Sequence, residues 1–194
     1  MHTLGLILAG GGGRRFGGVD KAFLPLRGRT TMSLLIETLR PQTASLAISA
    51  NGNPQRFSAF GLDVLSDGVH EGKGPLAGLA AGLEWAAAQD ADALLTVPVD
   101  TPLVPPDLVG RLEHPPAVAF AANRTHHLVA LWPLSCRFEL AEFLRGPGPY
   151  RVGDFGAKIH MRAAHFPATS KYFLNINTPS DLAALACGTR DGAS

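Results

Sequence analysis

Short apolar runs alternate with segments of helical spacing along the first half of the chain. Residues 3–9 form an apolar run that stops at four glycines, which is typical of a buried parallel strand entering a tight turn. Residues 31–40 carry apolar side chains at helical spacing and stop at Pro41. Residues 74–89 have the clearest helical pattern, with Pro75 in the first turn. Three further apolar runs, which predict strands, span residues 46–50, 62–65 and 93–99. This alternation predicts an α/β fold with three layers: a Rossmann-like, mostly parallel sheet with helices on both faces.

The second half of the chain is less regular. Residues 117–122 and 128–132 are apolar runs that predict strands, and residues 137–144 predict a helix. Near the C-terminus, Thr178-Pro179-Ser180-Asp181 is typical of a helix start, with Thr178 as the N-cap and an acid three residues later.

The composition is that of a globular protein. Hydrophobic residues make up 46% of the 194 residues and charged residues 17%, which is enough for a sizeable core. We find no internal repeat and no linker. We therefore expect one domain over residues 1–187, with a nucleotide-binding N-terminal half and an acceptor-binding C-terminal half, and a flexible tail at residues 188–194.

Charge and cysteine content narrow the function classes. The formal net charge of +1 argues against a broad nucleic-acid or membrane-binding face, but it allows a local anion pocket. We see no signal peptide and no apolar stretch near the ~20 residues of a membrane span. Cys136 and Cys187 are too few and too far apart for a disulfide scaffold, so we expect reduced thiols and a cytoplasmic location. None of the seven histidines, including the adjacent His126 and His127, has the spacing of a transition-metal site.

The glycine-rich segment after the first strand is the most informative part of the sequence. Consecutive glycines let backbone N–H groups point into one concavity, which suits phosphate oxygens, and Arg14, Arg15 and Lys21 add positive charge. No GK[ST] follows, so the segment is not a Walker A loop, and Arg15 occupies the third glycine position of G-x-G-x-x-G. The alternative is a flexible turn with two solvated arginines.

Two further features point to the same edge of the predicted sheet. Asp100 follows the strand at residues 93–99, where a carboxylate can hold Mg²⁺ against phosphate oxygens, although it could also cap a turn before Pro102. Gly74, Gly78 and Gly82 are four apart and line one helix face. We expect close approach of a nucleotide at Gly74, and either that role or close packing on the sheet at the other two.

Four segments resemble motifs of the molybdenum cofactor guanylyltransferases, the MobA type of nucleotidyltransferase. Residues 8–21, LAGGGGRRFGGVDK, are similar to the N-terminal signature without a gap, although Phe16 stands where the family usually has Met. The other three are GPLAGL at residues 74–79, PVDTP at 98–102 and NINTP at 175–179. The resemblance covers nearly the whole chain and implies the nucleotidyltransferase fold. The same superfamily includes sugar-1-phosphate nucleotidyltransferases and cytidylyltransferases.

The resemblance also implies roles for individual residues. Arg15, Lys21 and Asp100 would be catalytic, and Asp100 would hold Mg²⁺ as the cofactor metal. Asp67 would contact the guanosine and Asn51 the base, although Asn51 could equally be a turn residue in Asn51-Gly52-Asn53-Pro54. The full set of implied binding residues is Leu8, Ala9, Gly10, Gly11, Lys21, Asn51, Asp67, Gly74, Asn175 and Asn177.

The acceptor side is implied by the C-terminal motif. Asn175 and Asn177 are two apart on an extended segment, so their amides would point the same way, toward a pterin or a phosphate. The alternative is a polar loop that only caps the following helix. Residues 146–151, a Gly-Pro-rich stretch, are interpreted as a mobile loop near the acceptor.

The implied reaction is transfer of GMP from GTP to the phosphate of molybdopterin, with release of pyrophosphate. The partners would be these two substrates, with transient contact to other proteins of molybdenum cofactor biosynthesis, and neither nucleic acid nor membrane. One alternative is the same chemistry with CTP or with a sugar or polyol phosphate. Another is a nucleotide-binding paralogue without turnover.

Overall fold

A seven-stranded, mostly parallel sheet forms the centre of the fold. The structure is a computed structural model, and it describes residues 1–10, 19–167 and 171–187. β8 runs antiparallel to its neighbours β6 and β7, and the other neighbouring strands pair in parallel. In spatial order the strands are β5 (Asp63–Leu65), β4 (Leu46–Ser49), β1 (Thr3–Leu8), β6 (Ala93–Pro98), β8 (Arg124–Pro133), β7 (Ala117–Ala121) and β9 (Arg162–His165).

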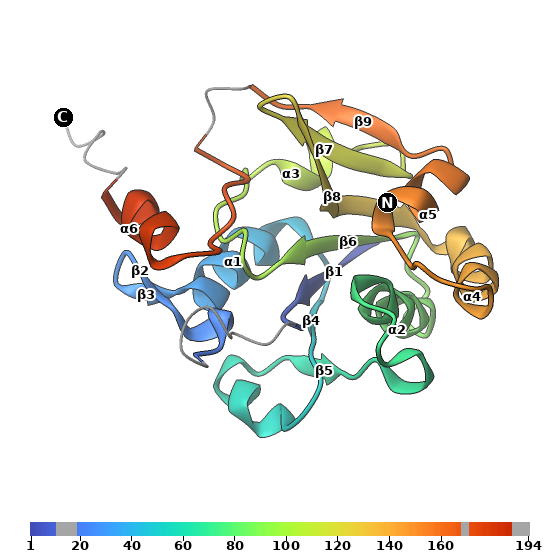
Figure 1. Cartoon of the computed structure of the whole chain (residues 1–194), viewed down its shortest axis with the longest axis horizontal. Coiled ribbons are helices and arrows are strands. Elements are labelled where there is room, and N and C mark those ends of the chain that lie inside the picture. The colour runs from blue at the N-terminus through green and yellow to red at the C-terminus, as the bar shows by residue number, and fades with distance from the viewer. Residues whose placement is uncertain (11–18, 168–170, 188–194) are drawn as a thin grey trace.

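Helices cover both faces of this sheet. α1 (Thr31–Leu39) and α3 (Leu108–Arg111) pack on one face, and α2 (Pro75–Ala87), α4 (Arg137–Arg145) and α5 (Val152–Lys158) pack on the other (Figure 1). Each face has its own buried apolar cluster, one built around α1 and the other around α2. The predicted three-layer α/β architecture is confirmed.

Most of the predicted elements are present. α1 ends at Leu39, just before Pro41, and Arg40–Gln42 continues as one 3-10 turn. β8 begins at Arg124, four residues before the predicted start at residue 128. The sequence analysis missed α3, α5, β9 and a short hairpin of β2 (Pro25–Leu26) and β3 (Arg29–Thr30). No helix in the described part of the chain is long and apolar enough to span a membrane.

Two glycines let α2 lie close against the sheet. A Cβ atom at Gly78 would come within 2.3 Å of Ser49 Oγ, and a Cβ atom at Gly82 within 2.5 Å of Leu6 Cδ2. No side chain fits at these distances, so both positions serve the close packing that the sequence left open. Gly78 also lines the cavity described below.

The C-terminal segment returns to the N-terminal part of the chain. α6 (Pro179–Cys187) lies beside the β2–β3 hairpin, and Leu24, Leu26, Ile176 and Leu185 form a small buried cluster there (Figure 1). Thr178 Oγ1 accepts a hydrogen bond from the Asp181 N–H, 3.2 Å away, which confirms the predicted cap. The segment that precedes α6 is thereby held against residues close to Lys21.

Candidate active site

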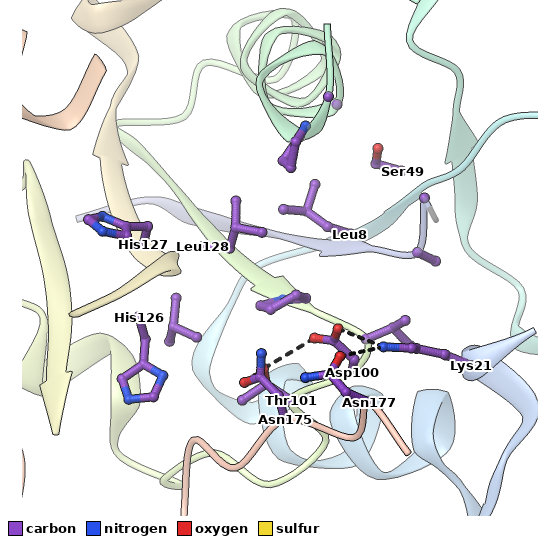
Figure 2. Close-up of a pocket in the computed structure, with 18 of the residues that line it drawn as sticks. Leu8, Lys21, Ser49, Asp100, Thr101, His126, His127, Leu128, Asn175 and Asn177 are labelled. Carbon is purple, nitrogen blue, oxygen red and sulfur yellow. Dashed lines mark hydrogen bonds and ion pairs between the residues drawn. The ribbon is translucent and has the colours of Figure 1, made fainter. Parts of the chain in front are cut away.

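A cavity of about 990 Å³ lies at the carboxyl edge of the sheet. β1, β4, β5 and β6 are parallel, so the residues that follow them meet at this edge. The antiparallel β8 brings its N-terminal residues to the same edge and completes the wall (Figure 2). The cavity therefore lies where open α/β sheets bind ligands.

Lys21 and Asp100 form an ion pair in this cavity. Lys21 Nζ lies 3.0 Å from Asp100 Oδ2 and donates a second hydrogen bond to Asn177 Oδ1, also at 3.0 Å (Figure 2). Lys21 starts a 3-10 turn that Asp20 caps through the Ala22 N–H, and the Thr31 hydroxyl donates to the Lys21 carbonyl. The backbone that carries the ammonium group is thus fixed from two sides.

The second asparagine of the C-terminal motif is held in the same way. The Thr101 hydroxyl donates to Asn175 Oδ1 at 3.1 Å, and the Ile176 N–H donates to the Asp100 carbonyl at 2.7 Å. Figure 2 shows both asparagines beside Asp100 and Thr101. These contacts join the loop after β6 to the segment before α6, although the two are more than seventy residues apart in sequence.

Asn51 and Asp67 form a reciprocal pair at another part of the cavity. Asn51 Nδ2 donates to Asp67 Oδ2 at 2.7 Å, and the Asp67 N–H donates to Asn51 Oδ1 at 2.9 Å. Because the amide group is held at both of its polar atoms, its orientation is set by the network. Asn51 and Asp67, to which the resemblance assigns contacts with the base and the guanosine, therefore lie together in the cavity wall, and the Asn51 side chain also fixes the loop after β5.

The backbone at Gly74, where we expected a nucleotide to approach closely, is open toward the cavity. Gly74 has φ +66°, a conformation that L side chains rarely adopt, and a Cβ atom there would meet nothing within 4 Å. Leu8 and Ala9 line the cavity, but the Ala9 N–H donates to the Ser49 carbonyl within the sheet. An amide cradle for phosphate would therefore begin at Gly10 and not at Ala9.

The structure places nearly all of the predicted site residues in this one cavity. Gly11 and Arg15, together with Arg14, lie outside the described residues. The loop at residues 146–151, which we expected near the acceptor, contributes no residue to the cavity lining. Its Tyr150 ring instead lies under the ammonium group of Lys73, 5.3 Å from the ring centre. The predicted residues that line the cavity are Leu8, Ala9, Gly10, Lys21, Asn51, Asp67, Gly74, Asp100, Asn175 and Asn177.

The sequence analysis missed the part of the wall that β8 supplies. Arg124, His126, His127 and Leu128 line the cavity, and His126 and His127 had been considered only as metal ligands. Their position depends on an irregularity in β8 that no periodicity indicates: Val118 pairs with Ala130 but the next residue, Ala119, pairs with His126. Residues 124–129 are four polar residues followed by two apolar ones, so no alternation of side chains marked this wall in the sequence.

The donor set around Asp100 suits a hard divalent cation. Mg²⁺ is usually bound by one or two carboxylates together with phosphate oxygens and water. Asp100 offers one carboxylate, and the side-chain oxygens of Asn177 and Thr101 lie beside it. Among the described residues, no group of three or more His, Cys, Asp or Glu side chains could hold a metal by itself. This arrangement fits a metal that is bound jointly with a nucleotide.

Comparison with known proteins gives the family. The MobA-like NTP transferase domain matches residues 5–159. A molybdenum cofactor guanylyltransferase of Acidiphilium cryptum is 54% identical over 187 residues, which cover 96% of this chain and 95% of the relative. A molybdenum cofactor guanylyltransferase of Cereibacter sphaeroides is 51% identical over 187 residues, which cover 94% of this chain and 95% of the relative.

Solved structures have the same fold at low identity. The molybdopterin-guanine dinucleotide biosynthesis protein A of Archaeoglobus fulgidus is 21% identical, with a TM-score of 0.71 over 95% of this chain and 96% of that one. A Mycobacterium tuberculosis protein solved in complex with manganese is 20% identical, with a TM-score of 0.65 over 96% of this chain and 98% of that one. By its sequence and its fold, the chain belongs to the molybdenum cofactor guanylyltransferases of the MobA-like NTP transferase family, and it is a nucleotidyltransferase.

Proposed function

We propose that the chain transfers GMP from GTP to the phosphate of molybdopterin, forming molybdopterin guanine dinucleotide and pyrophosphate. The names of the relatives support this reaction. The observation that carries it is the meeting of Lys21, Asp100 and Asn177 in one cavity, at 3.0 Å contacts. Residues from both halves of the chain converge there, as a two-substrate transfer requires.

In the proposed reaction an oxygen of the acceptor phosphate attacks the α-phosphorus of GTP. A new P–O–P bond forms, the bond between the α-phosphorus and the bridging oxygen breaks, and pyrophosphate leaves with that electron pair. The acceptor phosphate is already an anion, so no protein side chain needs to remove a proton. Catalysis then consists of positioning and charge neutralisation.

The residues of the chain would divide this work. Lys21 would offset charge on the phosphates, aided by Arg15 and by the backbone amides from Gly10 and Gly11 onward. Asp100 would hold Mg²⁺, which supplies charge neutralisation between the phosphates when it is bound. On the nucleotide side, Asn51 and Asp67 would face the guanine and the ribose, and the open backbone at Gly74 would admit the nucleotide.

The acceptor would bind on the other side of Asp100. Asn175 and Asn177 come from an extended segment whose side chains are fixed by Thr101 and Lys21. Their remaining N–H groups can donate to the acceptor phosphate. This arrangement would bring the phosphate of the acceptor close to the α-phosphate of the nucleotide.

One experiment tests the proposed function directly. The purified protein is incubated with Mg²⁺, molybdopterin and GTP, and the products are identified by mass. We expect molybdopterin guanine dinucleotide and pyrophosphate, and much less dinucleotide with CTP, ATP or UTP. Product with CTP in preference to GTP, or product only with a sugar phosphate acceptor, would contradict the assignment of substrates. GTP binding without any pyrophosphate release would contradict the assignment of turnover.

A further inference from the structure

The N-terminal part of β8 leaves the regular sheet at the edge of the cavity. β6 and β8 pair from Ala93 with Pro133 to Thr96 with Ala130, and the pairing stops there. On the other side, the register with β7 jumps from Ala130 to His126, so residues 127–129 bulge out of the strand. Bulges of this kind are frequent beside active sites, where they redirect side chains.

A buried network holds the bulge in place. Thr96 Oγ1 donates to the Leu128 carbonyl at 2.9 Å and accepts from Trp132 Nε1 at 2.8 Å. Thr96 and Trp132 are both buried. The carbonyl that the bulge removes from the ladder is therefore satisfied by a side chain.

His126 lies next to the bulge, lines the cavity and has an aromatic support. Its ring lies 5.2 Å from the Phe173 ring, at an interplanar angle of 34°. Phe173 is buried and has φ +67°, which is an unusual conformation for a bulky residue. Its N–H donates to the Leu103 carbonyl at 3.0 Å, and its ring packs edge-on against Phe166 at 4.8 Å. The imidazole thus has a rigid ring on one side and the cavity on the other.

The position of His126 separates it from the nucleotide side. In the sheet order, β4 and β5 lie on one side of β1, while β8 lies on the other, beyond β6. Figure 2 shows His126 and Lys21 at opposite sides of the pocket, with Asp100, Asn175 and Asn177 between them. Asn51 and Asp67, the residues proposed for the guanine, follow β4 and β5. A group bound at His126 would therefore belong to the second substrate.

At the His126 ring itself the chemistry favours a flat, polar heterocycle over a phosphate, whereas the charged Arg124 side chain of the same wall could contact an anion. Burial, and then the charge of Arg124, lower the pKa of His126, so the ring is neutral near pH 7 and offers one N–H donor and one acceptor nitrogen. The neighbouring Leu128 and Val129 add apolar surface. A neutral imidazole backed by a phenyl ring can stack on an aromatic heterocycle and bond to its edge, whereas it supplies no charge for a phosphate.

We propose that His126 binds the heterocyclic ring of the acceptor by stacking and hydrogen bonding, and that the β8 bulge and Phe173 position it. This inference rests on the proposed function, since it takes the acceptor to be a pterin that carries a phosphate. Asn175, Asn177 and Lys21 would hold the phosphate of the acceptor, and His126 would hold its ring.

The test compares His126→Ala with a matched control, His165→Ala. His165 is on β9, is exposed, lies 4.9 Å from the Phe120 ring and does not line the cavity. Both variants therefore lose a histidine whose ring packs at a tilt against a phenylalanine, but in only one of them does the histidine line the cavity. Initial rates of guanine dinucleotide formation are measured with molybdopterin varied at saturating GTP, and with GTP varied at saturating molybdopterin.

We expect His126→Ala to raise the KM for molybdopterin about tenfold, the scale of one lost ring contact, with the KM for GTP within twofold of wild type. His165→Ala should match wild type in both. An unchanged KM for molybdopterin in His126→Ala, or an equal rise in both KM values, would overturn the inference. Equilibrium dialysis with GTP alone provides a second readout, and its Kd should be the same in all three proteins.

The outcomes separate this inference from the proposed function. If the wild type makes no guanine dinucleotide, the proposed function fails, and the assignment of a pterin to His126 fails with it. If the wild type is active and His126→Ala has an unchanged KM for molybdopterin, only the assignment to His126 fails.

Discussion

At the scale of single residues, the ion pair between Lys21 and Asp100 serves the site more than the stability of the fold. Both side chains keep between a fifth and a quarter of their surface exposed. Pairs with this exposure contribute only about 0–1 kcal/mol to stability. The same two groups would make their main contacts to phosphates and metal during transfer, where water is excluded and each contact is stronger.

We therefore predict that Asp100→Ala lowers kcat at least about 10²-fold, equivalent to about 3 kcal/mol, while the protein stays folded. Lys21→Ala should lower kcat by a similar factor, also without unfolding the protein. The measurement is single-turnover dinucleotide formation, with circular dichroism as the check on folding. Asp107→Ala is the matched control, because Asp107 is an exposed acid seven residues downstream that pairs only loosely with Arg111, at 3.9 Å. Turnover of Asp100→Ala near the wild-type rate would contradict its proposed role.

The residues that were predicted from sequence are those that a local pattern marks. Lys21, Asp100 and Asn177 stand in short motifs, and the structure brings them within hydrogen-bonding distance. His126 could not be found in this way. Its place in the cavity depends on the bulge in β8 and on the Thr96 hydroxyl, which are tertiary features with no local signature.

At the scale of elements, α2 approaches the sheet only because it carries glycines. A methyl group at Gly82 would lie 2.5 Å from Leu6 Cδ2 and 2.9 Å from Leu94 Cδ2, and both leucines are fully buried. Since neither side chain can move into solvent, an added methyl group must displace the helix or strain the core.

Gly82→Ala should consequently lower the free energy of unfolding by about 1–3 kcal/mol. The comparison is Gly110→Ala in α3, where an added Cβ atom meets nothing within 4 Å. That substitution should leave stability unchanged or raise it by up to about 1 kcal/mol, because alanine favours the helix. Urea denaturation of both variants measures the difference. Equal destabilisation in the two would show that close packing is not the reason for glycine at position 82.

The start of α6 gives a prediction about pH. Backbone N–H groups of Asn177 and Thr178 donate to Asp181 Oδ2 at 2.9 and 2.8 Å, and together with the Thr178 hydroxyl they lower the pKa of Asp181 below its usual value. A carboxylate with a lowered pKa in the folded protein stabilises it above the unfolded pKa, and this contribution is lost as the pH falls through the folded pKa.

The destabilisation caused by Asp181→Asn should therefore be constant above about pH 5 and should shrink as the pH falls below about 4. Urea midpoints of the two proteins, measured between pH 3 and pH 7, test this. A difference that grows toward low pH would have the wrong sign and would refute the role of the ionised carboxylate.

Not all elements could be predicted from sequence. α1 and α2 have clear spacing and proline signals, and both were predicted to within two residues at each end. α5 contains Gly153 and Gly156, which disfavour a helix; tertiary packing compensates, since Phe155 stacks on Trp132 at 5.9 Å. β9 is only four residues long and pairs with β7 at the sheet edge, so its own sequence carries little signal.

At the scale of the whole molecule, the cavity is assembled from both ends of the chain. Lys21 near the N-terminus bonds to Asn177 near the C-terminus, and the small apolar cluster at Leu26, Ile176 and Leu185 holds these two segments together. The proposed nucleotide residues follow β4 and β5, whereas the proposed acceptor residues come from β8 and the segment before α6. Because Asp100 stands between the two, a metal held there together with GTP would link the segments on the two sides of the cavity.

This linkage should be measurable as thermal stabilisation. A ligand that binds the folded chain stabilises it by about 2.7 kcal/mol at one hundred times its Kd, which for a chain of this length raises Tm by roughly 5–10 °C. We expect a shift of this size with GTP and Mg²⁺ together, and a clearly smaller one with GTP and EDTA, because the phosphates then lose their link to Asp100. In Asp100→Ala the two conditions should give the same small shift. If GTP stabilised the wild type equally with and without the metal, Asp100 would not be the point at which metal and nucleotide join.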